Sequence, residues 1–340
     1  MPMQAGTEPT ASAPGDDHPA LILANLGTPA APTAAAVSAY LDEFLSDPRV
    51  VRLPRWLWRP LLRRVVLPRR SPVVAEKYAS VWLPGGSPLA VYTAALAAAV
   101  QARLPGWRVL HAMRYGAPSL ADALDGLRAD GVRDVRVLPL YPQYSTTTTE
   151  PVADVVAARA GGMSVRLLRD YHADPGWVAA VAASIRAHWD AHGRGERLLL
   201  SFHGLPQRVV DDGDPYALQC EASARAIAHA LGLQRDDLLL AFQSRFGKGK
   251  WLQPDVVDTL RRLAAEGVRT VDVACPGFAV DCLETLEEIA LQDAALFREA
   301  ALRQARGGRD PELRYIPCLN AGDAHADAIA ALARGETGWR

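Results

Sequence analysis

His203 stands where this sequence is best organised to present reactive chemistry. It follows an apolar strand pattern that opens with three successive leucines, residues 198–200, typical of a strand buried on both faces of a parallel sheet. Gly204 and Pro206 then force the chain to turn. Open α/β sheets bind ligands at the carboxyl ends of their strands. His203 is therefore a candidate acid–base or metal-binding group, although a loop histidine with only a local hydrogen bond would show the same pattern.

Three acidic residues form a second candidate group. They follow another apolar strand, residues 270–274, in a helix that we expect to open near Asp281. On an α-helix of about 100° per residue, Asp281, Glu284 and Glu288 would share one face. Crowded carboxylates near a partly dry cleft should hold protons more tightly than usual. The alternatives are that Asp281 only caps the helix and that the glutamates form a solvated first turn.

Topology favours a common site for these groups, because equivalent ends of neighbouring parallel strands converge on one cleft. An imidazole facing a carboxylate there can bind a divalent ion or relay protons. Tyr141 and Tyr144 follow a further strand, and their rings are available to a ligand. The hydroxyl run at residues 145–149 more simply predicts a capped helix start.

The elements that must position these residues alternate between strand and helix, which predicts an α/β protein with parallel sheets. The turn after residues 20–26 resembles the turn at His203, and 112–116 resembles 243–247. We therefore expect two similar halves, residues 19–170 and 171–334, the second opening with a long linking helix over 171–192. Residues 335–340 would be a tail, and residues 1–18 a disordered leader on a cytoplasmic protein.

The spacing of the repeats predicts an insertion in the first half. Gly27 and Gly204 are 177 positions apart, whereas Arg114 and Arg245 are 131 apart. We place the extra residues at about 48–88. Within them, residues 53–70 interleave two tryptophans and several aliphatic side chains with arginines, without an acid. This segment could lie at a membrane surface, form a mobile lip over a large apolar ligand, or pack as a helical hairpin whose arginines cover the protein's own surface.

Composition narrows the function. A net charge of −1 gives no overall field that would attract nucleic acid, and no apolar run is long enough to span a bilayer. The nucleotide-binding and serine-hydrolase glycine motifs and the H-E-x-x-H zinc motif are absent. The four cysteines form no C-x-x-C pair, and their wide spacing disfavours an iron–sulfur cluster. They are Cys220, Cys275, Cys282 and Cys318.

Taken together, these stretches resemble the ferrochelatase family of bacterial type, whose members insert ferrous iron into a porphyrin. The likeness extends from about residue 21 to residue 332. It rests on Asn25-Leu-Gly-Thr-Pro29, Gly85-Gly-Ser-Pro88, Arg114-Tyr-Gly116, Tyr141-Pro-Gln-Tyr-Ser145, Ser201-Phe-His-Gly-Leu-Pro206, Gln243-Ser-Arg245 and Asp281-Cys-Leu-Glu-Thr-Leu-Glu-Glu288.

The resemblance implies two Rossmann-like halves of the chelatase type, a porphyrin cleft between them and a lip made by the insertion. His203 and Glu284 match the pair associated with iron and the pyrrole protons, and Asp281 and Glu288 match a secondary acidic track. The positions that match the porphyrin pocket or its rim are Leu26, Arg114, Tyr115, Tyr141 and Trp251. No cofactor is implied beyond the substrate Fe²⁺, although an internal cluster at Cys275 and Cys282 stays open.

Leu26 favours protoporphyrin IX as substrate, because members that act on coproporphyrin commonly carry tyrosine at this position. The alternatives are a coproporphyrin III ferrochelatase, a cobalt chelatase of the same fold, and a porphyrin or haem carrier without activity. A carrier would not need the acidic track. The expected partners are a porphyrin, ferrous iron and, through residues 53–70, the inner face of the membrane.

Overall fold

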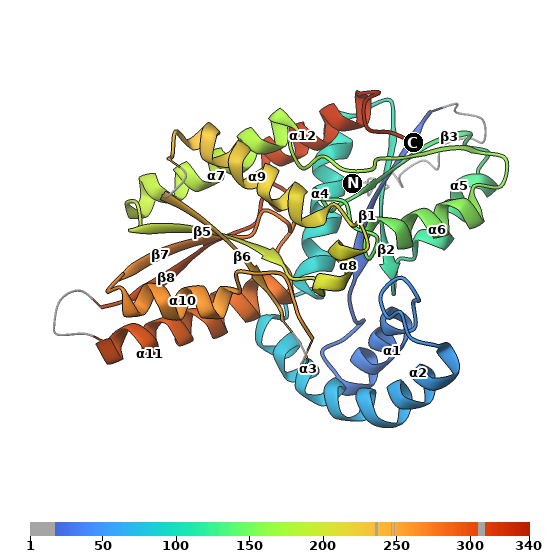
Figure 1. The fold of residues 1–340 in the computed structure, drawn as a ribbon. Helices are drawn as coiled ribbons and strands as arrows, with labels where there is room; N and C mark the ends of the chain where they lie inside the picture. The colour runs from blue at the N-terminus through green and yellow to red at the C-terminus, as the bar shows by residue number, and fades with distance from the viewer. Residues whose placement is uncertain (1–17, 235–236, 246, 248, 305–309) are drawn as a thin grey trace, which may run out of the picture.

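The structure, a computed structural model, describes residues 18–234, 237–245, 247, 249–304 and 310–340. All but His18 of the leader predicted for residues 1–18 thus lies outside the described residues. Within the described parts, the strands form two four-stranded parallel sheets. Their strand orders, β2-β1-β3-β4 and β6-β5-β7-β8, are the same sequence of second, first, third and fourth strand. The predicted pair of similar α/β halves is confirmed (Figure 1).

The first half places β1 in the interior of its sheet, paired with both β2 and β3. Its apolar residues 20–24 are fully buried because helices cover both faces, as the continuous apolar pattern predicts, whereas Leu26 near its end is partly exposed. Its elements are β1 (Ala20–Gly27), α4 (Pro88–Arg103), β2 (Arg108–Tyr115), α5 (Leu120–Ala129), β3 (Asp134–Pro139), α6 (Thr149–Arg159) and β4 (Ser164–Leu167).

The second half repeats this arrangement around β5, which ends at His203. Its elements are β5 (Arg197–His203), α8 (Gln207–Asp211), α9 (Tyr216–Leu231), β6 (Leu238–Gln243), α10 (Val256–Ala265), β7 (Thr270–Ala274), η3 (Glu284–Asp293), α11 (Ala294–Gln304) and β8 (Glu312–Ile316). The long helix expected after residue 283 is present, but its first ten residues form a π-helix rather than an α-helix.

Two helices join the halves through a shared core. α7 (Pro175–His192) begins at Asp174, whose carboxylate caps the Trp177 N–H, and it packs against α9 and α12 (Asp323–Arg334). α12 also packs on α4 of the first half. Beyond it, residues 335–340 return to the first sheet, where Arg340 and Leu167 exchange backbone hydrogen bonds of 2.9 and 2.8 Å. The predicted tail is therefore anchored beside β4.

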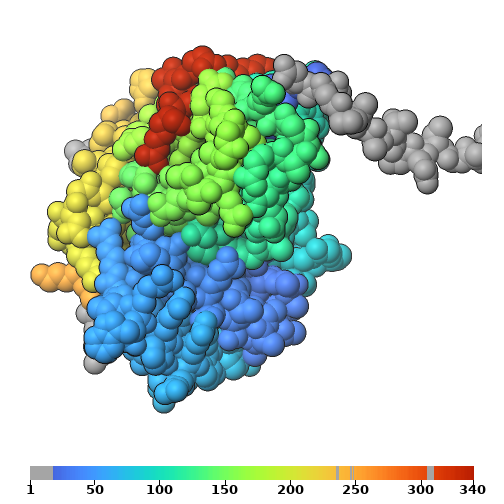
Figure 2. All heavy atoms as spheres, turned by 90° about the vertical axis from the view of Figure 1, so that its right-hand side faces the viewer, coloured from blue at the N-terminus to red at the C-terminus, as the bar shows by residue number. Residues whose placement is uncertain are grey.

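A separate helical lobe lies between β1 and α4, and it begins before the segment 48–88 in which the extra residues were expected. It consists of α1 (Ala34–Leu45), α2 (Arg55–Leu61), η1 (Leu62–Val66) and α3 (Leu67–Val81). It forms the blue end of the molecule in Figures 1 and 2, opposite α12. A small core of its own holds it together, including Val37, Leu41, Leu62 and Tyr78, and α3 packs against η3 of the second half. The lobe thus lies beside the acidic helix.

Candidate active site

His203 presents one ring nitrogen for chemistry. Its Nδ1 lies 2.7 Å from the backbone oxygen of Gly204, which accepts a hydrogen bond from that nitrogen. This contact assigns the proton of the neutral ring to Nδ1 and leaves the lone pair on Nε2. The ring is partly exposed and lies 6.4 Å, centroid to centroid, from Phe278. His203 can therefore act as a base at the edge of the second sheet.

The acidic residues are arranged by the π-helix. A π-helix forms i→i+5 hydrogen bonds and has wider turns than an α-helix, and such segments are frequent at functional sites. Glu284, Glu288 and Asp293 are four and five residues apart, about one such turn each. The expected α-helical face of Asp281, Glu284 and Glu288 is therefore wrong, since Asp281 precedes the helix and Asp293 joins the series instead.

Asp281 is held by the protein. Its carboxylate accepts hydrogen bonds from Asn320 Nδ2 at 2.7 Å, from Thr285 Oγ1 and the Cys318 N–H at 3.2 Å each, and from the Tyr315 hydroxyl. The side chain is 3% exposed. These contacts tie the segment after β8 to the start of η3, which favours the structural alternative for this residue.

Glu288 lies among like and opposite charges. Burial raises the pKa of its carboxyl group, and the Glu284 charge raises it further, whereas hydrogen bonds from Ser244 and the charge that His203 carries once protonated lower it. His203, Glu284 and Glu288 therefore belong to one electrostatic cluster, as the convergence of strand ends predicts.

Gln243 connects the strand that carries His203 with the helix that carries Glu284. It pairs with His203 in the β5–β6 register, and its Nε2 donates to the backbone oxygen of Glu284 at 2.8 Å. Its Oε1 accepts from Ser201 Oγ at 2.6 Å. The strand that carries the histidine is thus linked to the first residue of the acidic helix by one buried amide.

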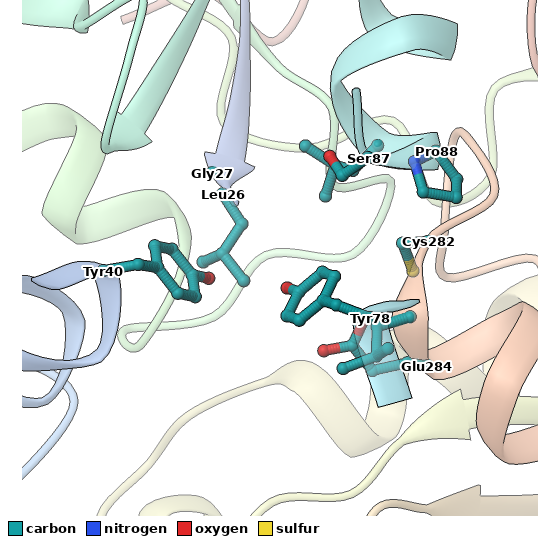
Figure 3. A pocket seen from close by; sticks show the side chains of 10 residues that line it. Leu26, Gly27, Tyr40, Tyr78, Ser87, Pro88, Cys282 and Glu284 are labelled. Atoms are coloured by element: carbon teal, nitrogen blue, oxygen red, sulfur yellow. The ribbon is translucent and has the colours of Figure 1, made fainter. Parts of the chain in front are cut away.

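A pocket opens between the helical lobe and the start of η3 (Figure 3). Leu26 at the end of β1 lines it, opposite Glu284, and the Tyr40 and Tyr78 rings enter from α1 and α3. Its remaining lining residues are Gly27, Ser87, Pro88, Leu89, Cys282 and Leu283. Leu26 and Glu284, predicted from separate motifs, therefore share one pocket.

Tyr40 and Tyr78 were missed by the sequence reasoning. Burial raises the pKa of both phenols, and the Glu284 carboxylate contributes in the same direction, which places both rings near that charge. In the sequence they stand in helical stretches of the lobe, where an aromatic residue more simply indicates core packing. Only the position of the lobe against η3 distinguishes the two roles.

The other pocket candidates take different positions. Arg114 pairs with Asp47 at 2.6 Å, and the Tyr115 hydroxyl donates to the same carboxylate at 2.9 Å. Tyr115 is 1% exposed and belongs to the core of the lobe rather than to the pocket lining, contrary to the expectation. The buried Tyr141 hydroxyl has no hydrogen-bond partner in the described residues. Trp251 lies against the turn at Gly204, next to His203.

The four cysteines are free thiols, three of them buried. Burial raises the pKa of each thiol above its usual range. Across the described ranges, no group of three or more His, Cys, Asp or Glu side chains has the geometry of a preformed metal site.

Comparison with known proteins gives one consistent result. The model of the family described as Ferrochelatase matches residues 18–337. A ferrochelatase of Xanthomonas axonopodis pv. citri is 58% identical over 318 residues, covering 93% of this chain and 97% of the relative. A ferrochelatase of Methylococcus capsulatus is 50% identical over 328 residues, covering 95% and 97%.

Solved structures share the fold. SirB from Bacillus subtilis with Fe³⁺ superposes with a TM-score of 0.55 at 10% identity, over 93% of this chain and 94% of that one. The sirohydrochlorin chelatase SirB from Bacillus subtilis subspecies spizizenii in complex with cobalt gives a TM-score of 0.50 at 9% identity, over 92% of each chain. At these identities the likeness concerns the arrangement of the two halves.

Proposed function

Because the chain belongs to the ferrochelatase family, we propose that His203 and Glu284 are the residues at which it inserts Fe²⁺ into protoporphyrin IX. The protein is a lyase that forms protohaem and releases two pyrrole protons. Porphyrin and ferrous iron are its substrates. The observation that carries the residue assignment is that Gly204 holds Nδ1 of His203, while Gln243, paired with His203 in the β5–β6 register, bonds the backbone of Glu284.

The chemistry of insertion accounts for these residue types. Two N–H protons must leave the macrocycle as iron enters, and an imidazole with an ordinary pKa of about 6.5 accepts a proton readily near neutrality. Neutral imidazole and carboxylate also suit a ferrous ion. In this proposal His203 Nε2 takes a pyrrole proton, and Glu284, at the pocket wall, guides iron or receives the second proton.

The porphyrin must also be bent, since a flat ring keeps its nitrogen lone pairs in its own plane. Contacts away from the metal supply that strain. The pocket is lined by Leu26 from β1, by Tyr40 and Tyr78 from the lobe, and by Leu283 from the second half. We expect these side chains to contact the porphyrin and so help to bend it.

His203→Ala tests the assignment. General acid–base catalysis contributes about 10²–10⁴-fold, so insertion at saturating porphyrin should fall by that factor while porphyrin binding, followed by fluorescence, is kept. His229→Ala, which removes an exposed histidine of α9, is the control. Ordinary turnover by His203→Ala would refute the assignment. A non-catalytic carrier would instead show no loss of porphyrin fluorescence when Fe²⁺ is added to catalytic amounts of the wild type.

Leu26 supports protoporphyrin IX over coproporphyrin III, because it presents an aliphatic surface beside Leu283 at the pocket. Such a surface suits a vinyl group better than a charged propionate. We expect a higher kcat/KM for protoporphyrin IX. Equal or lower turnover than on coproporphyrin III would contradict this preference.

We further propose that residues 53–70 hold the protein at the inner membrane face. One side of this segment packs into the lobe through Trp58, whose indole donates to the Leu45 oxygen at 2.6 Å, and through buried Leu62. The other side exposes 76% of Trp56, 53% of Leu57 and 47% of Leu61 among arginines. The expected helical hairpin is wrong, because α2, η1 and α3 follow one another without a turn from residue 55 to residue 81. The packed and the exposed surfaces are opposite faces of this helical segment. No helix among the described residues could cross a bilayer.

Vesicle sedimentation tests this contact. Exposed tryptophan and arginine favour anionic headgroups, so binding should be stronger to phosphatidylserine-containing vesicles than to neutral ones and should weaken with salt. Trp56→Ala should reduce binding, whereas Leu218→Ala, which removes a 68% exposed leucine of α9, should not. Equal binding by all three proteins would exclude residues 53–70 as the contact.

A further inference from the structure

Ser244, the first residue after β6, adopts a backbone conformation that is uncommon for its type. Its φ is 63°, in the left-handed region that residues other than glycine rarely occupy. Such conformations persist only where surrounding contacts hold them, and they concentrate at functional sites. The hydrogen bonds of Ser244 indicate what this conformation accomplishes.

Both donors of Ser244 reach one carboxylate. The backbone N–H donates to Glu288 Oε1 at 2.8 Å, and the side-chain hydroxyl donates to Oε2 at 2.6 Å. Each oxygen of Glu288 therefore has a fixed partner, which sets both the position and the plane of the group. Hydrogen bonds to a charged acceptor are among the stronger ones in proteins.

These two hydrogen bonds, here called the Ser244–Glu288 clamp, hold a carboxylate that repulsion from like charges would otherwise move away. Glu288 follows Glu284 by one turn of the π-helix and precedes Asp293 by another; Glu284 and Glu288 are partly exposed, and Asp293 is buried. An unanchored Glu288 side chain would turn away from its neighbours towards water. The adjacent Gln243 holds the backbone of Glu284, so residues 243–244 grip two successive turns of the helix.

We propose that Ser244 is a positioning residue for iron insertion, which holds the Glu288 carboxylate beside Glu284 and His203. This inference rests on the proposed roles of His203 and Glu284. Ser244 itself touches no reacting atom, and its effect passes through Glu288. Insertion should therefore depend on the hydroxyl of Ser244, whereas porphyrin binding should not.

Two substitutions separate the clamp from the shape of the turn. Ser244→Ala removes the hydroxyl, and Ser244→Gly removes the same hydroxyl but favours the left-handed backbone. We expect both to lower kcat about 10–100-fold, the loss for a hydrogen bond to a charged group, with the KM for porphyrin unchanged. Ser164→Ala, an exposed serine of β4, is the control.

A double-mutant cycle gives the decisive measurement. If Ser244 acts through Glu288, then Glu288→Ala and the Glu288→Ala/Ser244→Gly double variant should have the same kcat. Wild-type kcat in Ser244→Gly, or a further loss in the double variant, would overturn the inference. If His203→Ala retained activity, the site itself would be misplaced. Loss of activity in His203→Ala with full activity in Ser244→Gly would reject the clamp alone.

Discussion

Asp293 provides the sharpest test of the electrostatics of the π-helix. Its side chain is 4% exposed, and burial together with the charges of Glu288, Asp255 and Glu287 raises its pKa from 3.8 to about 7. Among the charges around it, Glu287 pairs with Lys77 at 3.1 Å and Asp255 with Arg245 at 3.6 Å. Asp293→Asn replaces the carboxyl group with a neutral one of the same shape.

The direction in which folding stability changes with pH follows from the protons that the folded and unfolded states bind. The folded state holds the Asp293 proton up to about pH 7, whereas the unfolded chain releases it near pH 4. The wild type therefore loses stability as pH rises between these values, by at most about 4 kcal/mol for a shift of about three pKa units. Asn has no charge to bury. The stability of Asp293→Asn relative to wild type should increase by about 1–3 kcal/mol between pH 5 and pH 8.

Urea unfolding at pH 5, 6, 7 and 8 measures this difference, with Asp190→Asn as the control. Asp190 is exposed on α7, so its substitution should change stability little at any of these pH values. A relative stability of Asp293→Asn that stays constant from pH 5 to pH 8 would refute the reasoning. So would a relative stability that decreases.

Two further substitutions test the packing that positions the site. Gly27→Ala should lower the free energy of unfolding in urea by about 3 kcal/mol or more. The reason is that φ of Gly27 is +119° and that a Cβ would lie 1.8 Å from the Tyr115 backbone oxygen. The control is Gly213→Ala, with φ +100° and no atom within 4 Å of a Cβ, which should cost only about 1 kcal/mol. Equal losses would rule out the close approach of β1 and β2. Trp177→Ala should cost about 3–5 kcal/mol in the same assay, since this side chain is 1% exposed in the core shared by both halves. Its control is Trp56→Ala, at a 76% exposed residue, which should cost under about 0.5 kcal/mol. A small loss for Trp177→Ala would mean that the halves do not depend on their common core.

Much of the fold could be predicted because it is encoded locally. The apolar runs before His203 and at 270–274 became β5 and β7, and Asp174 capped α7 as its position before Pro175 indicates. The repeated turns and their unequal spacing predicted two halves with an extra segment in the first. The carboxyl ends of parallel strands lie at one end of a sheet, so the placement of His203 after β5 and of Glu284 after β7 at the same end also followed from order along the chain.

The details of the site depend on contacts between distant residues. Ser244 and Glu288 are 44 positions apart, and nothing in either neighbourhood shows that both donors of a serine meet both oxygens of a glutamate. The role of Asp281 was likewise decided by Asn320 and Tyr315, from the segment at β8. Tyr40 and Tyr78 became pocket residues only because the lobe packs beside η3.

The sequence by itself thus determined the α/β architecture, its duplication and the strand ends at which the reactive residues stand, because these follow from hydrophobic periodicity and turn chemistry over a few residues. Only the tertiary structure decided that the acidic helix is a π-helix, that Asp293 rather than Asp281 continues its acidic series, and that Ser244 anchors Glu288. The π-helical conformation and the partners of each carboxylate depend on residues that are distant in the sequence and meet only in the folded protein. The spacing of residues along the chain therefore does not predict them.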